Sequence, residues 1–329
     1  MKVSDHNQKV LEKFAAMMVA RMEEMKASEW KKGWIARTYG GGPVNVEGRS
    51  YSGGNAFMLM LDSSMNDYEW PIYCTLKQLN RLGCHVNKGA TSMPVIFWDY
   101  QYIGPYDWKI TPEQYRSLDS EAQKLYRLSG FLKSYNVFNI DQTNFFSKQP
   151  EKAAALTKLF NKPCEASDSK GMYENASIDS MLSAQSWICP IELSKTQNAF
   201  YSPGSDSITV PEKRRFKQGR KKADVFRDGM EFYATLLHEM VHSTGTPERL
   251  NRNTGKRFGD NLYAKEELVA ELGAARVGQE LGFDKRILDN NAAYLDGWIS
   301  SLKQEPKFIL SLMGDVDKAS RMILEKLAA

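Results

Sequence analysis

Cysteine, histidine and long apolar runs are all scarce in this chain of 329 residues. The four cysteines are scattered and none belongs to a C-x-x-C pair, which argues against a structural zinc knuckle and against a disulfide framework. We expect these thiols to be reduced and mostly buried. No apolar run of about 18 residues is present to span a bilayer, and residues 1–10 are too polar for a signal peptide. These absences predict a cytoplasmic protein with no membrane partner.

Net charge is small as well, at +4, so the distribution of charge is more informative than its sum. Residues 30–46 and 71–98 each contain three basic residues and no acid, and residues 213–222 contain seven basic residues. Local basic patches in a near-neutral chain are typical of a groove for a polyanion. For any single patch, an ordinary solvated surface is the simpler interpretation.

The length predicts two domains, each large enough to bury its own core. Two X-Pro steps and a polar cluster between residues 141 and 169 mark the boundary, so we place the domains at 1–150 and 165–329. Helical or strand periodicity predicts helices over 5–27, 75–82, 227–244, 263–281 and 288–304, and strands over 91–102, 135–140 and 207–210. The expected fold class is α+β in both halves.

The strongest chemical signal is the segment His238-Glu239-Met240-Val241-His242. Side chains at i and i+4 share one face of a helix, so the two histidines can hold one zinc ion between them. Glu239 then lies beside the metal as a general base toward a metal-bound water. Asp228 is the predicted N-cap of this helix and Gly245 its C′ residue.

A catalytic zinc needs a third protein ligand and one open position. Glu267 and Glu271 share a face of the following predicted helix, and we assign Glu267 as the ligand. Glu271 is then expected to accept the N–H of a ligand histidine. The reverse assignment of these two carboxylates remains the alternative, and a solvated position is expected for Glu266. This arrangement resembles the Glu-zincin metallopeptidases, in which a glutamate on a second helix completes the zinc site.

Five of the seven tryptophans lie in the first 110 residues, among several lysines and arginines. Stacking rings interleaved with cations are typical of surfaces that bind single-stranded nucleic acid. For any one tryptophan, a place in the core is the simpler interpretation.

Motifs spread over nearly the whole chain resemble the ArdC antirestriction family. They include Trp30-Lys31-Lys32-Gly33-Trp34, Tyr51-Ser52-Gly53-Gly54-Asn55, Val86-Asn87-Lys88-Gly89-Ala90, Val95-Ile96-Phe97-Trp98, Phe200-Tyr201-Ser202-Pro203 and Glu248-Arg249-Leu250-Asn251-Arg252. Two departures stand out. Gly54 replaces a residue that is larger in the family pattern, which predicts a looser turn, and residues 104–130 lengthen the first domain.

The resemblance implies a small mixed α/β domain that binds single-stranded DNA, followed by a zincin-like metallopeptidase domain. It also implies a mobile-element protein that protects incoming DNA from restriction enzymes. The candidate DNA contacts are Lys31, Lys32, Trp34, Arg37, Arg49, Asn55, Lys77 and Lys88. Three functions stay open at this point: a DNA-binding protector whose zinc domain is structural or vestigial, an active zinc peptidase that cleaves a DNA-associated protein, and an intracellular peptidase with no DNA role. The resemblance of the first half to the ArdC family argues against the third.

Overall fold

Helices and strands alternate through the computed structural model, which describes residues 5–27, 34, 41–160, 166–252, 261–283 and 295–328. The first half contains α1 (Asp5–Ala27), β1 (Val44–Asn45), α2 (Gly53–Met65), β2 (Ile72–Thr75), α3 (Leu76–Arg81), β3 (Met93–Ile103), β4 (Lys109–Ile110), α4 (Pro112–Arg116), α5 (Ser120–Gln123), β5 (Arg127–Asn139), α6 (Phe145–Lys148) and α7 (Pro150–Thr157). The second half contains α8 (Ala176–Ala184), β6 (Ile191–Ser194), β7 (Phe200–Ser202), β8 (Ser207–Pro211), α9 (Lys222–Ser243), α10 (Asn261–Glu280), α11 (Leu295–Gln304) and α12 (Phe308–Ala328).

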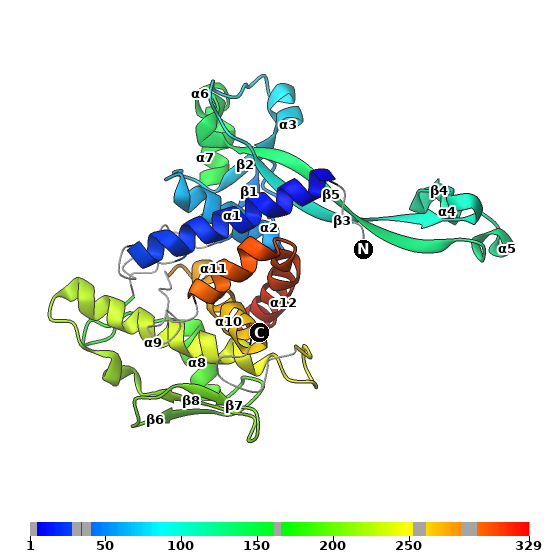
Figure 1. Ribbon diagram of the computed structural model, residues 1–329. Coiled ribbons are helices and arrows are strands. Elements are labelled where there is room, and N and C mark those ends of the chain that lie inside the picture. The colour runs from blue at the N-terminus through cyan, green and yellow to red at the C-terminus, as the bar shows by residue number, and fades with distance from the viewer. Residues whose placement is uncertain are drawn as a thin grey trace.

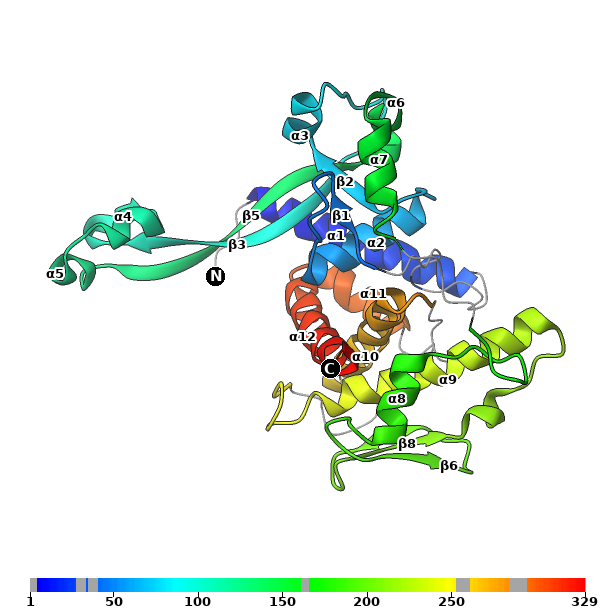
Figure 2. The ribbon, with the colours of Figure 1, turned by 180° about the vertical axis from the view of Figure 1, so that it is seen from behind.

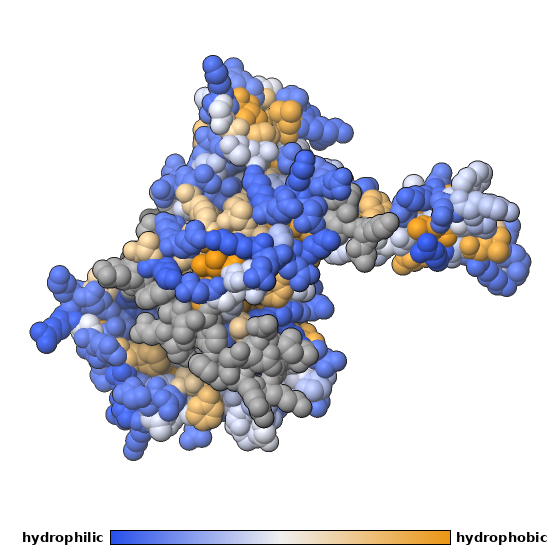
Figure 3. Space-filling view, viewed as in Figure 1, coloured by the Kyte–Doolittle hydropathy of each residue, from blue (hydrophilic) through white to orange (hydrophobic). Residues whose placement is uncertain are grey.

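The first half is organised by a sheet in the order β1-β2-β5-β3-β4, in which only the β1–β2 pair is parallel. Strands β3 and β5 pair over the whole of β3 and extend away from the body as an arm (Figure 1). The stretch 104–130 forms the tip of this arm with β4, α4 and α5, where the rings of Tyr102 and Tyr115 stack 3.6 Å apart. Apolar side chains are exposed there, among them Leu125 and Leu128 (Figure 3). The strand predicted over 135–140 is therefore only the end of a much longer one.

The second half places a small sheet, in the order β6-β8-β7, beside helix α9 (Figure 2). Strand β8 confirms the strand predicted over 207–210, and β7 is the edge strand that contacts α9. Helix α9 begins at Lys222, so the prediction of Asp228 as its N-cap is wrong. The Asp228 carboxylate instead accepts hydrogen bonds from the backbone N–H groups of Gln218 and Gly219, and so fixes the turn that precedes the helix.

One hydrophobic core runs through both halves. Its buried members include Met18 of α1, Phe57 of α2, Leu236 of α9, Leu268 of α10 and Leu312 of α12. A second, smaller cluster lies beneath α3, α6 and α7. The region 141–169, expected to be a polar connection, contains α6 and α7, while the division into 1–150 and 165–329 stays a prediction. The structure thus joins the two halves through a shared hydrophobic core.

Helix α12 is an addition to the helices expected from the sequence. Its buried side chains recur at helical spacing, at Ile309, Leu312, Met313, Val316 and Ile323, and pack toward α2 and α10. No helix in the described residues is both long and apolar enough to cross a membrane. Cys74, Cys84 and Cys189 are free and buried, as expected, and Cys164 lies outside the described residues.

Candidate metal centre and nucleic-acid cleft

Helix α9 presents the two histidines of its H-E-x-x-H segment on one buried face. The spacing of four residues brings the Nε2 atoms of His238 and His242 within 3.1 Å of each other. The side chains of His238 and His242 are only 3% and 16% exposed. The two nitrogens therefore converge in a site from which bulk water is largely excluded.

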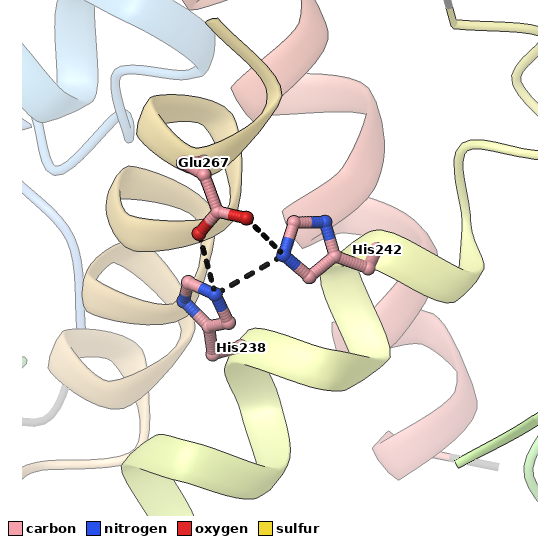
Figure 4. Close-up of side chains that lie close together, drawn as sticks. All are labelled: His238, His242 and Glu267. Carbon is pink, nitrogen blue, oxygen red and sulfur yellow. Dashed lines mark hydrogen bonds and ion pairs between the residues drawn. The ribbon is translucent and has the colours of Figure 1, made fainter. Parts of the chain in front are cut away.

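Glu267 on α10 faces both histidines (Figure 4). Its Oε2 lies 3.4 Å from Nε2 of His238, and its Oε1 lies 3.6 Å from Nε2 of His242. One donor atom from each residue fits within a group spanning 4.8 Å. A tetrahedral zinc ion with bonds of about 2.0–2.1 Å would separate its donors by roughly 3.3 Å. The three side chains therefore have both the donor types and the spacing that a zinc ion requires.

Two further carboxylates face the outer nitrogens of the histidines. Oε1 of Glu271 lies 3.7 Å from Nδ1 of His238, on the side where Glu271 was expected. Nδ1 of His238 is buried without a hydrogen-bond partner, whereas Nδ1 of His242 lies 3.2 Å from Oε1 of Glu266. An imidazole that binds metal through Nε2 carries its proton on Nδ1, and this N–H can donate a hydrogen bond to a carboxylate. Each histidine therefore has a carboxylate that could fix its tautomer.

Glu266 is not solvated, which corrects the expectation from the sequence. Only 4% of the residue is exposed, and its carboxylate receives two charge-assisted hydrogen bonds from Arg252, at 2.6 and 2.9 Å. Arg252 also donates to the carbonyl oxygen of Val241, next to His242. Sequence reasoning missed this pair, because the sequence does not reveal which arginine of the loop after α9 contacts Glu266 on α10.

The carboxylates alter the pKa values of the central groups. Burial alone lowers the pKa of His242, but the hydrogen bond with Glu266 and the charges of Glu267 and Glu239 outweigh it and raise that pKa to about 9. Burial raises the pKa of Glu267, but hydrogen bonding to His238 and the charges of both histidines reverse this and lower it to about 2. The centre therefore has the negative potential that a cation needs.

Glu239, the predicted general base, is held by the edge strand of the small sheet. Its Oε2 accepts a hydrogen bond of 2.8 Å from the backbone N–H of Tyr201 in β7. The residue is 7% exposed. Because one oxygen is fixed by this bond, the orientation of the carboxylate is set by the sheet rather than by α9 alone.

A cleft of about 760 Å³ opens beside the larger sheet and contains three of the predicted DNA contacts. Arg49 and Lys77 are exposed and line it, together with Asn55. The Asn55 amide donates to the carbonyl oxygen of Ile96 at 2.7 Å and accepts from its N–H at 2.9 Å, so this side chain holds β3 to α2. Lys88 is exposed but does not line the cleft.

Three aromatic side chains lie beside these cations. Phe97, Trp98 and Tyr135 line the cleft and are 43%, 49% and 51% exposed. The rings of Phe97 and Tyr135 meet edge to face at 5.5 Å. Half-exposed rings next to exposed cations form a surface on which bases could stack while phosphates are neutralised.

Trp34 belongs to the core, which corrects its prediction as a DNA contact. None of its side chain is exposed, and its ring packs edge-on to Phe57. A fully buried ring has no face to offer a base. The predicted contacts Lys31, Lys32 and Arg37 lie outside the described residues.

Family models match both halves of the chain in the order expected. Residues 8–138 match the N-terminal domain of anti-restriction factor ArdC, and residues 178–313 match a zincin-like metallopeptidase. Among curated proteins, a DNA primase TraC of Escherichia coli is 30% identical over 308 residues, which is 92% of this chain but 26% of that protein. A second TraC of the same species is matched over only 20% of its length, so the chain spans about a quarter or less of these two relatives. An uncharacterised protein of Sinorhizobium fredii is 26% identical, over 82% of this chain and 76% of its own.

Solved structures repeat the same arrangement of the whole chain. The metal-free crystal structure of the antirestriction protein ArdC from plasmid R388 is 25% identical, with a TM-score of 0.63 over 96% of this chain and 97% of that one. The Mn(II)-bound structure of ArdC is 22% identical, with a TM-score of 0.60, and supports the fold alone. Fold and site together define a zincin-like metallopeptidase domain that follows a mixed α/β domain. The chain is an ArdC-type two-domain protein.

Proposed function

We propose that this chain is an antirestriction protein of a mobile element, which binds single-stranded DNA in the cleft of its N-terminal half and one zinc ion in its C-terminal half. The observation that carries the proposal is the joint presence of Arg49, Lys77 and half-exposed aromatic rings in one cleft of an ArdC-type N-terminal domain. A strand covered in this way is shielded from nucleases. We place the protein in the cytoplasm, where incoming DNA meets restriction enzymes.

The chemistry of the cleft favours single strands over duplex. Arg49 and Lys77 form no ion pair in the described part of the chain, so their charges are available to phosphates. Phe97, Trp98 and Tyr135 need unpaired bases, because a duplex keeps its base faces stacked on one another. Binding without strong sequence preference follows, since every base has a face that stacks.

The proposed metal is zinc because two imidazole nitrogens and one carboxylate are a common catalytic zinc set. His238, His242 and Glu267 would hold the ion, with Glu271 and Glu266 orienting the two imidazoles. A bound zinc ion would supply Lewis-acid polarisation and an acidified water. Glu239 would take a proton from that water at the carboxylate oxygen that Tyr201 leaves unbound.

The second candidate function is proteolysis of a DNA-associated protein. It is favoured by the complete set of His238, Glu239, His242 and Glu267, which a purely structural metal site does not need. Under this alternative, DNA binding would recruit the peptidase domain to proteins on the incoming strand. The substrate of that reaction is part of the alternative and not of the main proposal.

The test compares two double charge reversals in the full chain. Arg49→Glu with Lys77→Glu alters the cleft, whereas Lys9→Glu with Lys158→Glu makes the same change of charge at exposed positions outside it that are not candidate DNA contacts. Fluorescence anisotropy with single-stranded and duplex oligonucleotides should show a loss of at least about tenfold for the cleft variant only. Protection of transferred DNA in a restricting recipient should fall with it. Equal effects of the two variants would contradict the proposed cleft.

A further inference from the structure

We propose that helix α12 of the C-terminal half forms the second wall of the DNA cleft, so that one single strand contacts both halves of the protein. This inference rests on the proposed function, because it concerns the same cleft. The inference extends the proposed function by adding a DNA-binding surface in the half that carries the candidate metal centre. The N-terminal half alone then holds only part of the site.

The walls of the cleft come from distant parts of the sequence. Arg49 and Lys77 line the cavity from the N-terminal half, and Leu310, Met313, Gly314 and Asp317 of α12 line it from the C-terminal half. Helix α12 packs directly on α2, whose first residues also line the cleft. Any ligand that fills the cavity between the cations and α2 therefore meets α12.

The position of this wall is fixed by close packing against α2. A Cβ atom on Gly54 would lie 2.8 Å from Cβ of Met313, closer than two carbon atoms can approach. Gly53 has a φ of +60°, and a Cβ there would lie 3.4 Å from the carboxylate of Asp317. Gly53 and Gly54 thus permit close contact between α2 and α12. The looser turn that the sequence predicts at Gly54 is not seen, because Gly54 lies within α2. Because Leu312, Met313 and Val316 are buried at the same time, α12 cannot move away without opening the core.

The side chains of the α12 wall differ in chemistry from Arg49 and Lys77. Leu310 is partly exposed and offers an apolar side chain, whereas Met313 is buried against Gly54 and holds the wall in place. Asp317 forms an ion pair with Arg321 one turn along the helix. Gly314 is exposed, and the space where its side chain would project is open. A wall of this kind suits bases and sugars, whereas Arg49 and Lys77 suit phosphates. We therefore place the bases toward Phe97, Trp98 and α12.

Gly314 provides the test, because a side chain added there enters the open cleft without disturbing the core. Gly314→Glu should weaken binding of single-stranded oligothymidine by about fivefold or more at low salt, since a carboxylate is placed near phosphates. Gly314→Arg should leave binding equal or tighter, and Gly314→Ala should leave it within about twofold. Gly297 of α11 is the matched control, because it is also an exposed helical glycine of the second half and lies outside the cleft. Among the residues that the structure describes, no atom lies within 4 Å of the place where its Cβ would stand.

Binding isotherms are measured on the full chain by fluorescence anisotropy, and melting temperatures check that each variant folds. If Gly314→Glu weakens binding no more than Gly297→Glu does, the α12 wall is wrong, although the proposed function stands if Arg49→Glu with Lys77→Glu still loses affinity. If the unchanged protein fails to bind single strands at all, the proposed function itself is wrong.

A second measurement uses the unchanged protein and so does not depend on folding of a variant. An oligonucleotide containing 4-thiothymidine is photo-crosslinked to the full chain, and the attached peptides are mapped. The α12 wall predicts crosslinks within residues 308–328 as well as in β3 and β5. Crosslinks confined to the N-terminal half would overturn it.

Discussion

The candidate metal centre gathers its three donor atoms within 4.8 Å from two helices. The proposed DNA cleft, of about 760 Å³, takes its lining from strands, loops and helices of both halves. Donors in the first are almost fully buried, while Arg49, Lys77, Phe97, Trp98 and Tyr135 in the second are exposed or half-exposed. The difference predicts how each responds to change. Single substitutions in the metal centre should have sharp effects, and those in the cleft should have graded ones.

The largest effect is expected from His238→Ala combined with His242→Ala. Two of the three donors disappear, so the stoichiometric zinc that we predict for the purified protein should be lost completely. Inductively coupled plasma mass spectrometry measures this directly. The single-strand affinity of the same variant should be retained, provided that its melting curve shows a folded protein. Retention of one metal per chain would refute the ligand assignment.

Glu271→Gln should have the next largest effect. Loss of the negative charge facing Nδ1 of His238 should lower zinc affinity by about tenfold to a hundredfold, although the amide oxygen can still accept a hydrogen bond. Competition with a chromogenic chelator gives the affinity. Glu248→Gln, at an exposed glutamate, is the control and should change nothing.

Glu266→Gln tests the carboxylate that faces the other histidine, His242. It should lower zinc affinity and also leave the buried Arg252 without its carboxylate. Breaking a buried pair destabilises a fold by about 3–5 kcal/mol, so the melting temperature should fall as well. If the variant weakens zinc binding without any loss of thermal stability, the ion pair between Arg252 and Glu266 does not stabilise the fold.

Trp98→Ala should give a graded loss in the cleft. Removal of one stacking ring costs about 1–3 kcal/mol, and for a half-exposed ring we expect the lower end, or roughly fivefold in single-strand affinity. Trp108→Ala is the matched control, since that ring is 73% exposed at the tip of the arm and does not line the cleft. Equal losses in both variants would shift the DNA surface from the cleft to the arm.

The smallest effect is expected from Glu239→Gln. The substitution keeps the metal donors and removes the general base, so zinc content and single-strand affinity should each stay within about twofold of the unchanged protein. Protection of transferred DNA should then survive if coverage of the strand is sufficient. Loss of protection with intact DNA binding would establish the proteolytic alternative.

The sequence predicts the metal centre well because its information is local. The four-residue spacing in α9 and the pairing of Glu267 with Glu271 on α10 follow from helical geometry alone, and the structure brings all four side chains together. Arg252 and Tyr201 were missed, since each reaches the centre from a loop or strand whose path only the fold defines.

The cleft was less predictable because its parts meet only through tertiary packing. Tryptophan count alone could not separate Trp34, buried against Phe57, from Trp98, half-exposed in β3. The helix 5–27 was confirmed to the residue, yet α12 was overlooked although its apolar residues have helical spacing. The arm was also missed, because a strand interrupted by the polar stretch 104–130 gives no sign that β3 and β5 pair across it.

The contact between Gly54 and Met313 has a consequence for how such proteins can diverge. The close packing of α12 on α2 depends on the absence of a side chain at position 54, since a Cβ there must push α12 outward or be met by a smaller residue at position 313. The two positions should therefore change together, and a double-mutant cycle should show that Met313→Ala rescues Gly54→Ala by more than the sum of the separate effects allows. Two uncharged residues in the lining of the proposed DNA cleft would in this way determine how wide a strand the protein accepts.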